Sequence, residues 1–267
     1  MSVVASFLVL AAATAATTDP QPLRGDLTSD LVYTSSTTAV WLFAETAGKS
    51  LFAPDACRWC NPPGFDESAR DLRWSKPVAA ELAGAGTAFV LAPAAAFGLT
   101  WLAAGHDDRA REQWTNALWV LEGVSSAMVL TNLAKWSFGR ERPAVHFRAT
   151  DWENFSEKER NLSFFSGHSS LAFSLAVSSG TVASLRGYRW APLVWAVGLP
   201  VAAFTAYSRI AADAHYLSDV VVGSVMGALV GGGIPLLFHG RADGPEKAAR
   251  VVPYADGRVF GLAGNFD

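Results

Sequence analysis

Four long apolar runs separated by short polar segments fill most of the chain after residue 76. They cover residues 77–105, 114–136, 190–210 and 216–238. Each run is long enough to cross the hydrocarbon core of a bilayer as a helix. A further run over 169–185 is rich in serine and only moderately apolar, so we expect a helix buried among the others. The pattern predicts an all-α fold, a membrane-embedded helix bundle over residues 77–240.

The part of the chain before this bundle is less regular. Residues 1–18 form an apolar segment typical of a secretory signal, although no Lys or Arg precedes it, and an uncleaved helix is the alternative. Residues 19–76 predict a linker, a short helix over 31–48 and a loop with both cysteines. The polar residues 34–38 interrupt that helix. The alternating directions of the later spans place residues 49–76 outside the cytoplasm, and a cleaved signal places the mature N-terminus there as well, so this helix cannot cross the membrane. We therefore expect it to lie along the bundle or the membrane surface.

Three polar clusters stand where apolar runs meet loops. Successive runs change direction, so all three clusters should lie at the same end of the bundle. The clusters are Lys135-x6-Arg142-Pro143, Ser166-Gly167-His168 and Ser208-Arg209-x5-His215-x3-Asp219.

The residue types in these clusters fit a phosphate. The cations Lys135, Arg142 and Arg209 suit a tetrahedral oxyanion. Two histidines can divide phosphoryl transfer into nucleophilic attack and protonation of the leaving oxygen. Asp219 lies one helical turn after His215 and can fix its tautomer, which favours His215 as nucleophile and His168 as acid.

Two groups of small residues predict different roles, one in the phosphate site and one in helix packing. Ser166 and Gly167 open a helix, and backbone N–H groups at a helix N-terminus bind anions. Gly223, Gly227 and Gly231 recur every four residues in the last apolar run, which indicates close packing against a neighbouring helix.

The three clusters resemble the K-x6-R-P, P-S-G-H and S-R-x5-H-x3-D motifs of the type 2 phosphatidic acid phosphatase and vanadium haloperoxidase superfamily. The first and third match at every fixed position, and Phe165 replaces the usual proline of the second. The resemblance implies a phosphohistidine on His215, oriented by Asp219, with His168 as acid. It also implies that the phosphate-binding residues are Lys135, Arg142, Ser166, Gly167 and Arg209, and that the enzyme uses neither metal nor other cofactor.

Composition narrows the remaining choices. The chain is 51% hydrophobic and 17% charged, and its net charge of −3 argues against a nucleic-acid partner. Cys57 and Cys60 predict a local disulfide or two free thiols rather than catalysis. Glu122 lies within an apolar run, where we favour a buried hydrogen bond between helices over a substrate or proton role. The tail over 241–267 contains Asp256-Gly257 between apolar residues, which is compatible with a small hairpin.

These observations predict a membrane phosphatase that hydrolyses a lipid phosphate monoester or diphosphate, such as a phospholipid or polyprenyl phosphate. We expect it in a bacterial inner membrane with its active site facing the periplasm. Two alternatives remain: a soluble periplasmic acid phosphatase or vanadate-dependent haloperoxidase, and a non-enzymatic helical membrane protein. Orthovanadate would inhibit a phosphatase but support halide oxidation by a peroxidase.

Overall fold

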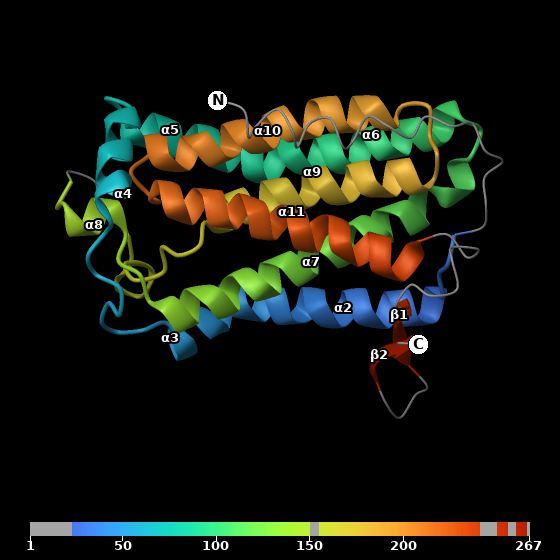
Figure 1. The fold of residues 1–267 in the computed structure, drawn as a ribbon, viewed down its shortest axis with the longest axis horizontal. Helices are drawn as coiled ribbons and strands as arrows, with labels where there is room; N and C mark the ends of the chain where they lie inside the picture. The colour runs from blue at the N-terminus through green and yellow to red at the C-terminus, as the bar shows by residue number, and fades with distance from the viewer. Residues whose placement is uncertain (1–22, 150–154, 241–249, 256–259, 266–267) are drawn as a thin grey trace.

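The computed structural model describes residues 23–149, 155–240, 250–255 and 260–265. Long helices run side by side along the molecule and leave short helices and loops at its two ends (Figure 1). This confirms the all-α bundle. In chain order the elements are α2 (Leu27–Phe43), η1 (Ala44–Gly48), α3 (Lys49–Phe52), α4 (Gly64–Ser68), η2 (Ala69–Leu72), α5 (Pro77–Gly86), η3 (Thr87–Leu91), α6 (Ala92–His106), η4 (Ala110–Glu112), α7 (Gln113–Phe138), α8 (Pro143–His146), η6 (Glu157–Glu159), α9 (Gly167–Leu185), α10 (Ala191–Ala211), α11 (Leu217–His239), β1 (Arg250–Ala255) and β2 (Phe260–Asn265).

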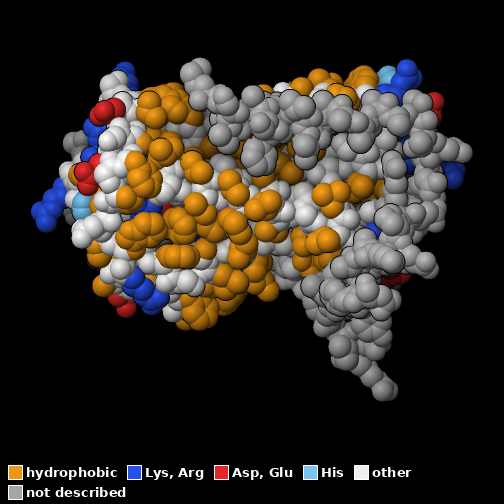
Figure 2. All heavy atoms as spheres, viewed as in Figure 1, with side chains coloured by type: hydrophobic (Ala, Val, Ile, Leu, Met, Phe, Trp, Pro, Cys, Tyr) orange, Lys and Arg blue, Asp and Glu red, His pale blue; other side chains and the backbone are white. Residues whose placement is uncertain are grey.

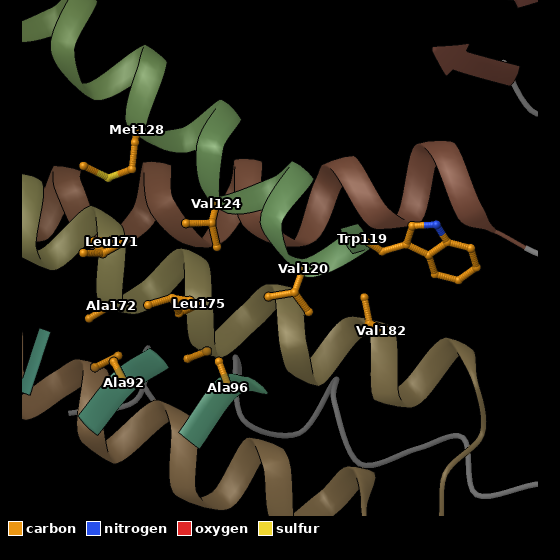
Figure 3. Close-up of a cluster of buried hydrophobic side chains, with 12 residues drawn as sticks. Ala92, Ala96, Trp119, Val120, Val124, Met128, Leu171, Ala172, Leu175 and Val182 are labelled. Carbon is orange, nitrogen blue, oxygen red and sulfur yellow. The ribbon is translucent and has the colours of Figure 1, made fainter. Parts of the chain in front are cut away.

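Helix α9 is the centre of the bundle, in contact with α6, α7, α10 and α11. Its small residues allow these neighbours to approach, and most of its side chains are buried. Figure 3 shows the core beside it, where Val120 and Val124 of α7 face Leu171 and Leu175 of α9. The moderately apolar run is therefore an interior helix, as its composition predicts.

The glycine stripe of α11 packs against the serines of α9. A Cβ atom on Gly231 would stand 2.6 Å from the Cα of Ser174, and one on Gly227 would stand 2.8 Å from the Cα of Ser170. Real Cβ atoms do not come so close, so the two backbones meet only because these positions lack side chains. The predicted packing role of the stripe is confirmed.

Among the described residues, four helical segments are long and apolar enough to cross a membrane: Pro77–His106, Ala110–Phe138, Ala191–Ala211 and Leu217–His239. The first continues through Pro93, with the π-turn η3 directly before it. Apolar side chains such as Leu82, Phe89 and Leu229 are exposed on the flank. Figure 2 shows apolar side chains over the middle of the molecule and charged ones mainly at its two ends. This distribution fits a bundle surrounded by lipid.

Helix α2 corrects our expectation for the N-terminal part. It begins at Leu27, where a linker was expected, and runs uninterrupted because the Thr34 and Thr37 hydroxyls donate to carbonyls one turn earlier. It does lie along the bundle, but it also extends from one end to the other (Figure 1). Just before α2, Arg24 Nε donates to the Gly240 carbonyl at 2.9 Å, beside the end of α11. Just after α2, the Glu45 side chain accepts from Asn132, which lies in the last turns of α7 at the other end of the bundle. The length of α2 along the bundle conflicts with the parity argument against crossing, although α2 is not among the four segments that are long and apolar enough to span.

Glu122 forms the expected hydrogen bond between helices. Its carboxylate is fully buried and lies 2.6 Å from Nε2 of His239, which joins α7 to α11. Asp30 of α2 accepts a hydrogen bond from Trp119 at 3.1 Å close by. These contacts fasten α2 to the bundle at the end that carries Gly240.

The tail contains the hairpin that its sequence suggested. Strands β1 and β2 pair in antiparallel fashion, with Arg250 opposite Asn265 and Ala255 opposite Phe260. The signal-like segment 1–18 and the Asp256-Gly257 turn lie outside the described residues.

Candidate active site

The three sequence clusters come together in one cavity of about 800 Å³. It lies at the end of the bundle where α7 and α10 finish and where α9 and α11 begin (Figure 1). The alternating direction of the apolar runs therefore predicts this convergence correctly. The predicted site residues that line the cavity are Lys135, Arg142, Gly167, His168, Arg209 and His215.

Arg209 offers unsatisfied donors to this cavity. Its side chain is 2% exposed, and Nη2 pairs with Glu81 at 2.8 Å. Its Nε and Nη1 are buried without a hydrogen-bond partner in the described part of the chain. Buried donors are rarely left unpaired in native structures, because an unmade hydrogen bond costs about 1–3 kcal/mol. An oxyanion in the cavity would satisfy them.

Arg142 places a second guanidinium against the same space. Its Nε donates to the carbonyl of Glu159, and Nη1 donates to that of Ala214, both at 2.9 Å. Burial, and then the charge of Arg209, lowers the pKa of Arg142 to about 10. The group is therefore still a cation at neutral pH. The two guanidiniums repel each other, and an anion bound between them would offset this repulsion.

His215 is held as a neutral imidazole with a defined tautomer. Nη1 of Arg142 donates to Nε2 at 3.1 Å, and a guanidinium cannot accept, so the Nε2 lone pair faces the cations. The proton then sits on Nδ1, 3.6 Å from Oδ2 of Asp219. Burial, followed by the charges of Arg142 and Arg209, lowers the pKa of His215 well below its ordinary value. An unprotonated Nε2 is the form that can attack phosphorus.

Asp219 lies behind the cavity wall and is completely buried. The Ser163 hydroxyl donates to its Oδ2 at 2.5 Å, and the backbone N–H of Tyr216 donates to the same atom at 3.0 Å. Arg140 donates to Oδ1 at 2.5 Å. The carboxylate is thus fixed from both sides next to the His215 ring.

The start of α9 differs from expectation at one residue. The N–H of Ser166 donates to the Asp219 carbonyl at 3.0 Å, and its hydroxyl caps the helix through Ser169. Ser166 therefore supports the site rather than offering its own N–H to phosphate. Gly167 does line the cavity, and a Cβ there would stand 3.0 Å from Nζ of Lys135. His168 follows, with its ring centroid 5.0 Å from that of Phe89.

Other polar residues do not join this constellation. His146 lies 3.0 Å from Glu141 and does not line the cavity, and His106 pairs with Asp107 at the opposite end. The ring of Phe155 lies under the guanidinium of Arg142. Cys57 and Cys60 form the predicted disulfide.

Sequence reasoning missed two groups of residues. Lys49, Glu45, Glu81 and Glu159 line the cavity around the predicted cations, and Lys49 pairs with both Glu45 and Glu159 at 3.2 Å. Arg140 and its partners hold Asp219 from outside the cavity. Of these residues, only Arg140 could have been singled out from the sequence, because it stands between the fixed positions Lys135 and Arg142 of the first cluster.

The fold defines a helical bundle with four segments apolar enough to cross a membrane, and a cavity lined by buried cations lies at one end of it. Residues 116–243 match the model of the PAP2 superfamily, a span that contains all three clusters. This region of the chain is therefore similar to that superfamily. Its boundaries cover α7 to α11 and leave α2 to α6 outside.

Curated relatives agree with the family. The chain is 34% identical over 136 residues to phospholipid phosphatase 1 of Rattus norvegicus, covering 41% of this chain and 47% of that one. It is 33% identical over 135 residues to phospholipid phosphatase 2 of Homo sapiens, covering 41% and 46%. A lipid A 1-phosphatase of Porphyromonas gingivalis is 34% identical over 102 residues, covering 38% and 19%. The match thus spans about half the length of the phospholipid phosphatases and less of the lipid A enzyme.

Proposed function

We propose that this protein is a lipid phosphatase that works through a phosphohistidine on His215. One observation carries the proposal: His215, with Nε2 unprotonated and in contact with Arg142, lines the same cavity as Arg209, whose Nε and Nη1 are buried and unpartnered among the described residues. A nucleophile and unsatisfied cationic donors directed at one space are what phosphoryl transfer requires.

The shape of the cavity supports an amphiphilic substrate. Beside the charged cluster, the cavity is lined by Trp41, Met128 and Leu171 from inside the bundle, and by Val78 and Phe89. Val78 and Phe89 are also more than half exposed, so the cavity wall is continuous with the apolar flank. A phosphate head group can therefore bind the cations while its hydrocarbon part stays in apolar surroundings. Phosphatidate, a polyprenyl diphosphate and a lipid A phosphate all share this chemistry.

The reaction then has two steps. Nε2 of His215 attacks phosphorus and the bond to the lipid oxygen breaks, while His168 gives that oxygen its proton. Burial, and then the charge of Arg209, lowers the pKa of His168, and the negative charge of a bound phosphate opposes this shift and favours the protonated ring. Asp219 stabilises the positive charge that develops on the His215 ring, and the arginines hold the phosphoryl oxygens. In the second step, His168 takes a proton from water, the hydroxide attacks phosphorus, and inorganic phosphate leaves with His215 restored.

The test is phosphate release by protein purified in detergent, measured with phosphatidate, a polyprenyl diphosphate and lipid A. We expect His215→Ala and His168→Ala each to lower kcat on the order of 10²-fold or more, because each removes a reacting group. His106→Ala is the matched control, since His106 is a partly exposed histidine at the other end of the bundle. Near wild-type rates in both site variants would refute the proposal.

We further propose that the active end faces away from the cytoplasm of a bacterial inner membrane. The short loops of the other end carry Arg109, Arg111, Arg186 and Arg189, as short cytoplasmic loops do, while the cations of the active end lie in longer loops and in the proposed site. An outward-facing site also suits the disulfide between Cys57 and Cys60, which persists in oxidising compartments.

A further inference from the structure

We propose that the segment Trp59–Leu72, which precedes the family-matched region, acts as a clamp that positions the His215–Asp219 pair. The inference rests on the proposed function of that pair. The clamp consists of Trp59, Asp66 and Arg70, and it acts through Arg140. None of the four lines the cavity, so the clamp is a set of positioning residues that do not touch substrate.

Arg140 is the connecting residue. It is 1% exposed and is among the largest fully buried side chains in the described part of the molecule. Its Nη1 donates to Asp219 and its Nη2 donates to Asp66 at 2.7 Å, so one guanidinium joins two buried carboxylates. The ring of Trp59 lies 3.9 Å from the guanidinium carbon and that of Tyr216 lies 4.1 Å from it. Stacking between two rings leaves the guanidinium little freedom to turn.

Asp66 fixes the first turn of α11, the helix that carries Asp219. It is completely buried and accepts hydrogen bonds from the N–H of Ser218 at 2.8 Å and from its hydroxyl at 2.6 Å. A carboxylate at a helix N-terminus is favoured both by the unpaired N–H groups and by the helix dipole. Asp66 thus places both the backbone of this turn and the arginine that holds its acid.

Arg70 fixes the loop that carries His215. Its Nε and Nη2 donate to the two carboxylate oxygens of Asp213 at 2.8 and 2.7 Å, a bidentate pair. Asp213 has a φ of 56°, a left-handed conformation that is uncommon for residues other than glycine, and the pair with Arg70 holds its side chain there. The clamp therefore grips the histidine loop and the aspartate helix at separate points.

Positioning matters because the ring of His215 does not yet make a hydrogen bond with Asp219, although it contacts Arg142 and the backbone of Ser163. Arg142 contacts Nε2, while Nδ1 lies 3.6 Å from Asp219, within reach of a hydrogen bond after a small movement. As the ring gains positive charge during attack, the carboxylate must be in place to accept a hydrogen bond from Nδ1–H. A displacement of about 1 Å in a reacting group can cost about 10²-fold in rate.

The experiment replaces Asp66 by asparagine in the full-length protein and measures phosphate release from phosphatidate micelles. Asp66→Asn keeps the shape but removes the charge that holds Arg140, so we expect kcat to fall at least about tenfold while KM stays within about twofold. Asp71→Asn is the matched control, because Asp71 is exposed on the neighbouring η2 helix. Wild-type kcat in Asp66→Asn would overturn the clamp.

A double-mutant cycle separates positioning from general damage to the fold. If Asp66 acts only through Asp219, then Asp66→Asn should lower kcat no further in an Asp219→Asn background, whereas unrelated structural damage would add to the loss. If Asp66→Asn does not fold, Arg140→Lys carries the same cycle, since lysine keeps the charge but loses the two-sided contact. An additive loss in the cycle would also overturn the clamp. Failure of the proposed function looks different, because the wild-type protein would then release no phosphate.

Discussion

At the scale of single residues, Arg142 gives His215 both its tautomer and its charge state. As an obligate donor it leaves the Nε2 lone pair free of protons, and as a nearby cation it opposes protonation of the ring. The same side chain would bind phosphate in the proposed reaction. Nucleophile and anion site are therefore coupled, so a change at Arg142 should alter both rate and pH dependence.

This coupling predicts a shift in the pH profile. His215 attacks only when its ring is neutral. Because its pKa is lowered, the ring stays neutral at pH values below the ordinary pKa of histidine, so activity should persist as pH falls through about 6.5. Arg142→Gln removes a positive neighbour, so it should raise the pKa of His215 and move the acid limb of kcat/KM to higher pH, in addition to lowering the rate. The measurement is kcat/KM between about pH 4.5 and 8 for both proteins. Because both use the same substrate, its own ionisation cancels, and an unmoved limb would contradict the coupling.

The residues of the site differ in how far sequence could place them. His215 and Asp219 stand four apart and Lys135 ends an apolar run, so helical spacing and alternating direction predict their convergence. Ser166, a predicted phosphate ligand, does not line the cavity, and its N–H bonds to the Asp219 carbonyl, a tertiary contact that no local pattern encodes. Asp66 lies more than 150 residues from its partner Ser218, and only the folded chain brings them together.

At the scale of elements, apolar length alone predicts most helices to within a few residues. α2 is the exception, because its run of threonines and serines suggests a break. The hydroxyls of Thr34 and Thr37 instead donate to the helix's own carbonyls, and Thr37 reaches Ser125 of α7 at 2.7 Å. Polar residues within α2 thus make contacts to the bundle, while Leu31, Val40 and Leu42 are exposed. A scale based on mean hydropathy misses such a helix.

The contact between α9 and α11 gives a stability prediction. Gly227→Ala would drive a methyl group into the backbone of Ser170, so we expect a loss of about 1–3 kcal/mol and a lower unfolding temperature in detergent. Gly233→Ala is the matched control in the same helix, since a Cβ there meets nothing within 4 Å. Tryptophan fluorescence on heating measures both. An equal response of the two variants would show that close packing is not what Gly227 supplies.

At the scale of the whole molecule, the six long rods α2, α5 with α6, α7, α9, α10 and α11 connect the same two ends (Figure 1). The hydrogen bond from Arg24 to Gly240 shows that the described chain enters α2 and leaves α11 at the end opposite the active site. If all six rods cross the membrane, the number of crossings is even, so the start of α2 and the end of α11 lie on the same side in either orientation. A cleaved secretory signal would place the start of α2 outside, on the side that we propose for the active end, so the two expectations conflict.

Labelling of single cysteines from one side of the membrane decides this conflict. Thr28, Arg111 and Glu67 are exposed, the first two at the far end and the third beside the active end. Native Cys57 and Cys60 are joined in a disulfide and do not react with a maleimide. In spheroplasts, a membrane-impermeant maleimide should label Glu67→Cys but neither Thr28→Cys nor Arg111→Cys, and all three should react after permeabilisation. If Thr28→Cys reacts together with Glu67→Cys, α2 does not cross, and the parity argument from the sequence would stand against the arrangement of the bundle.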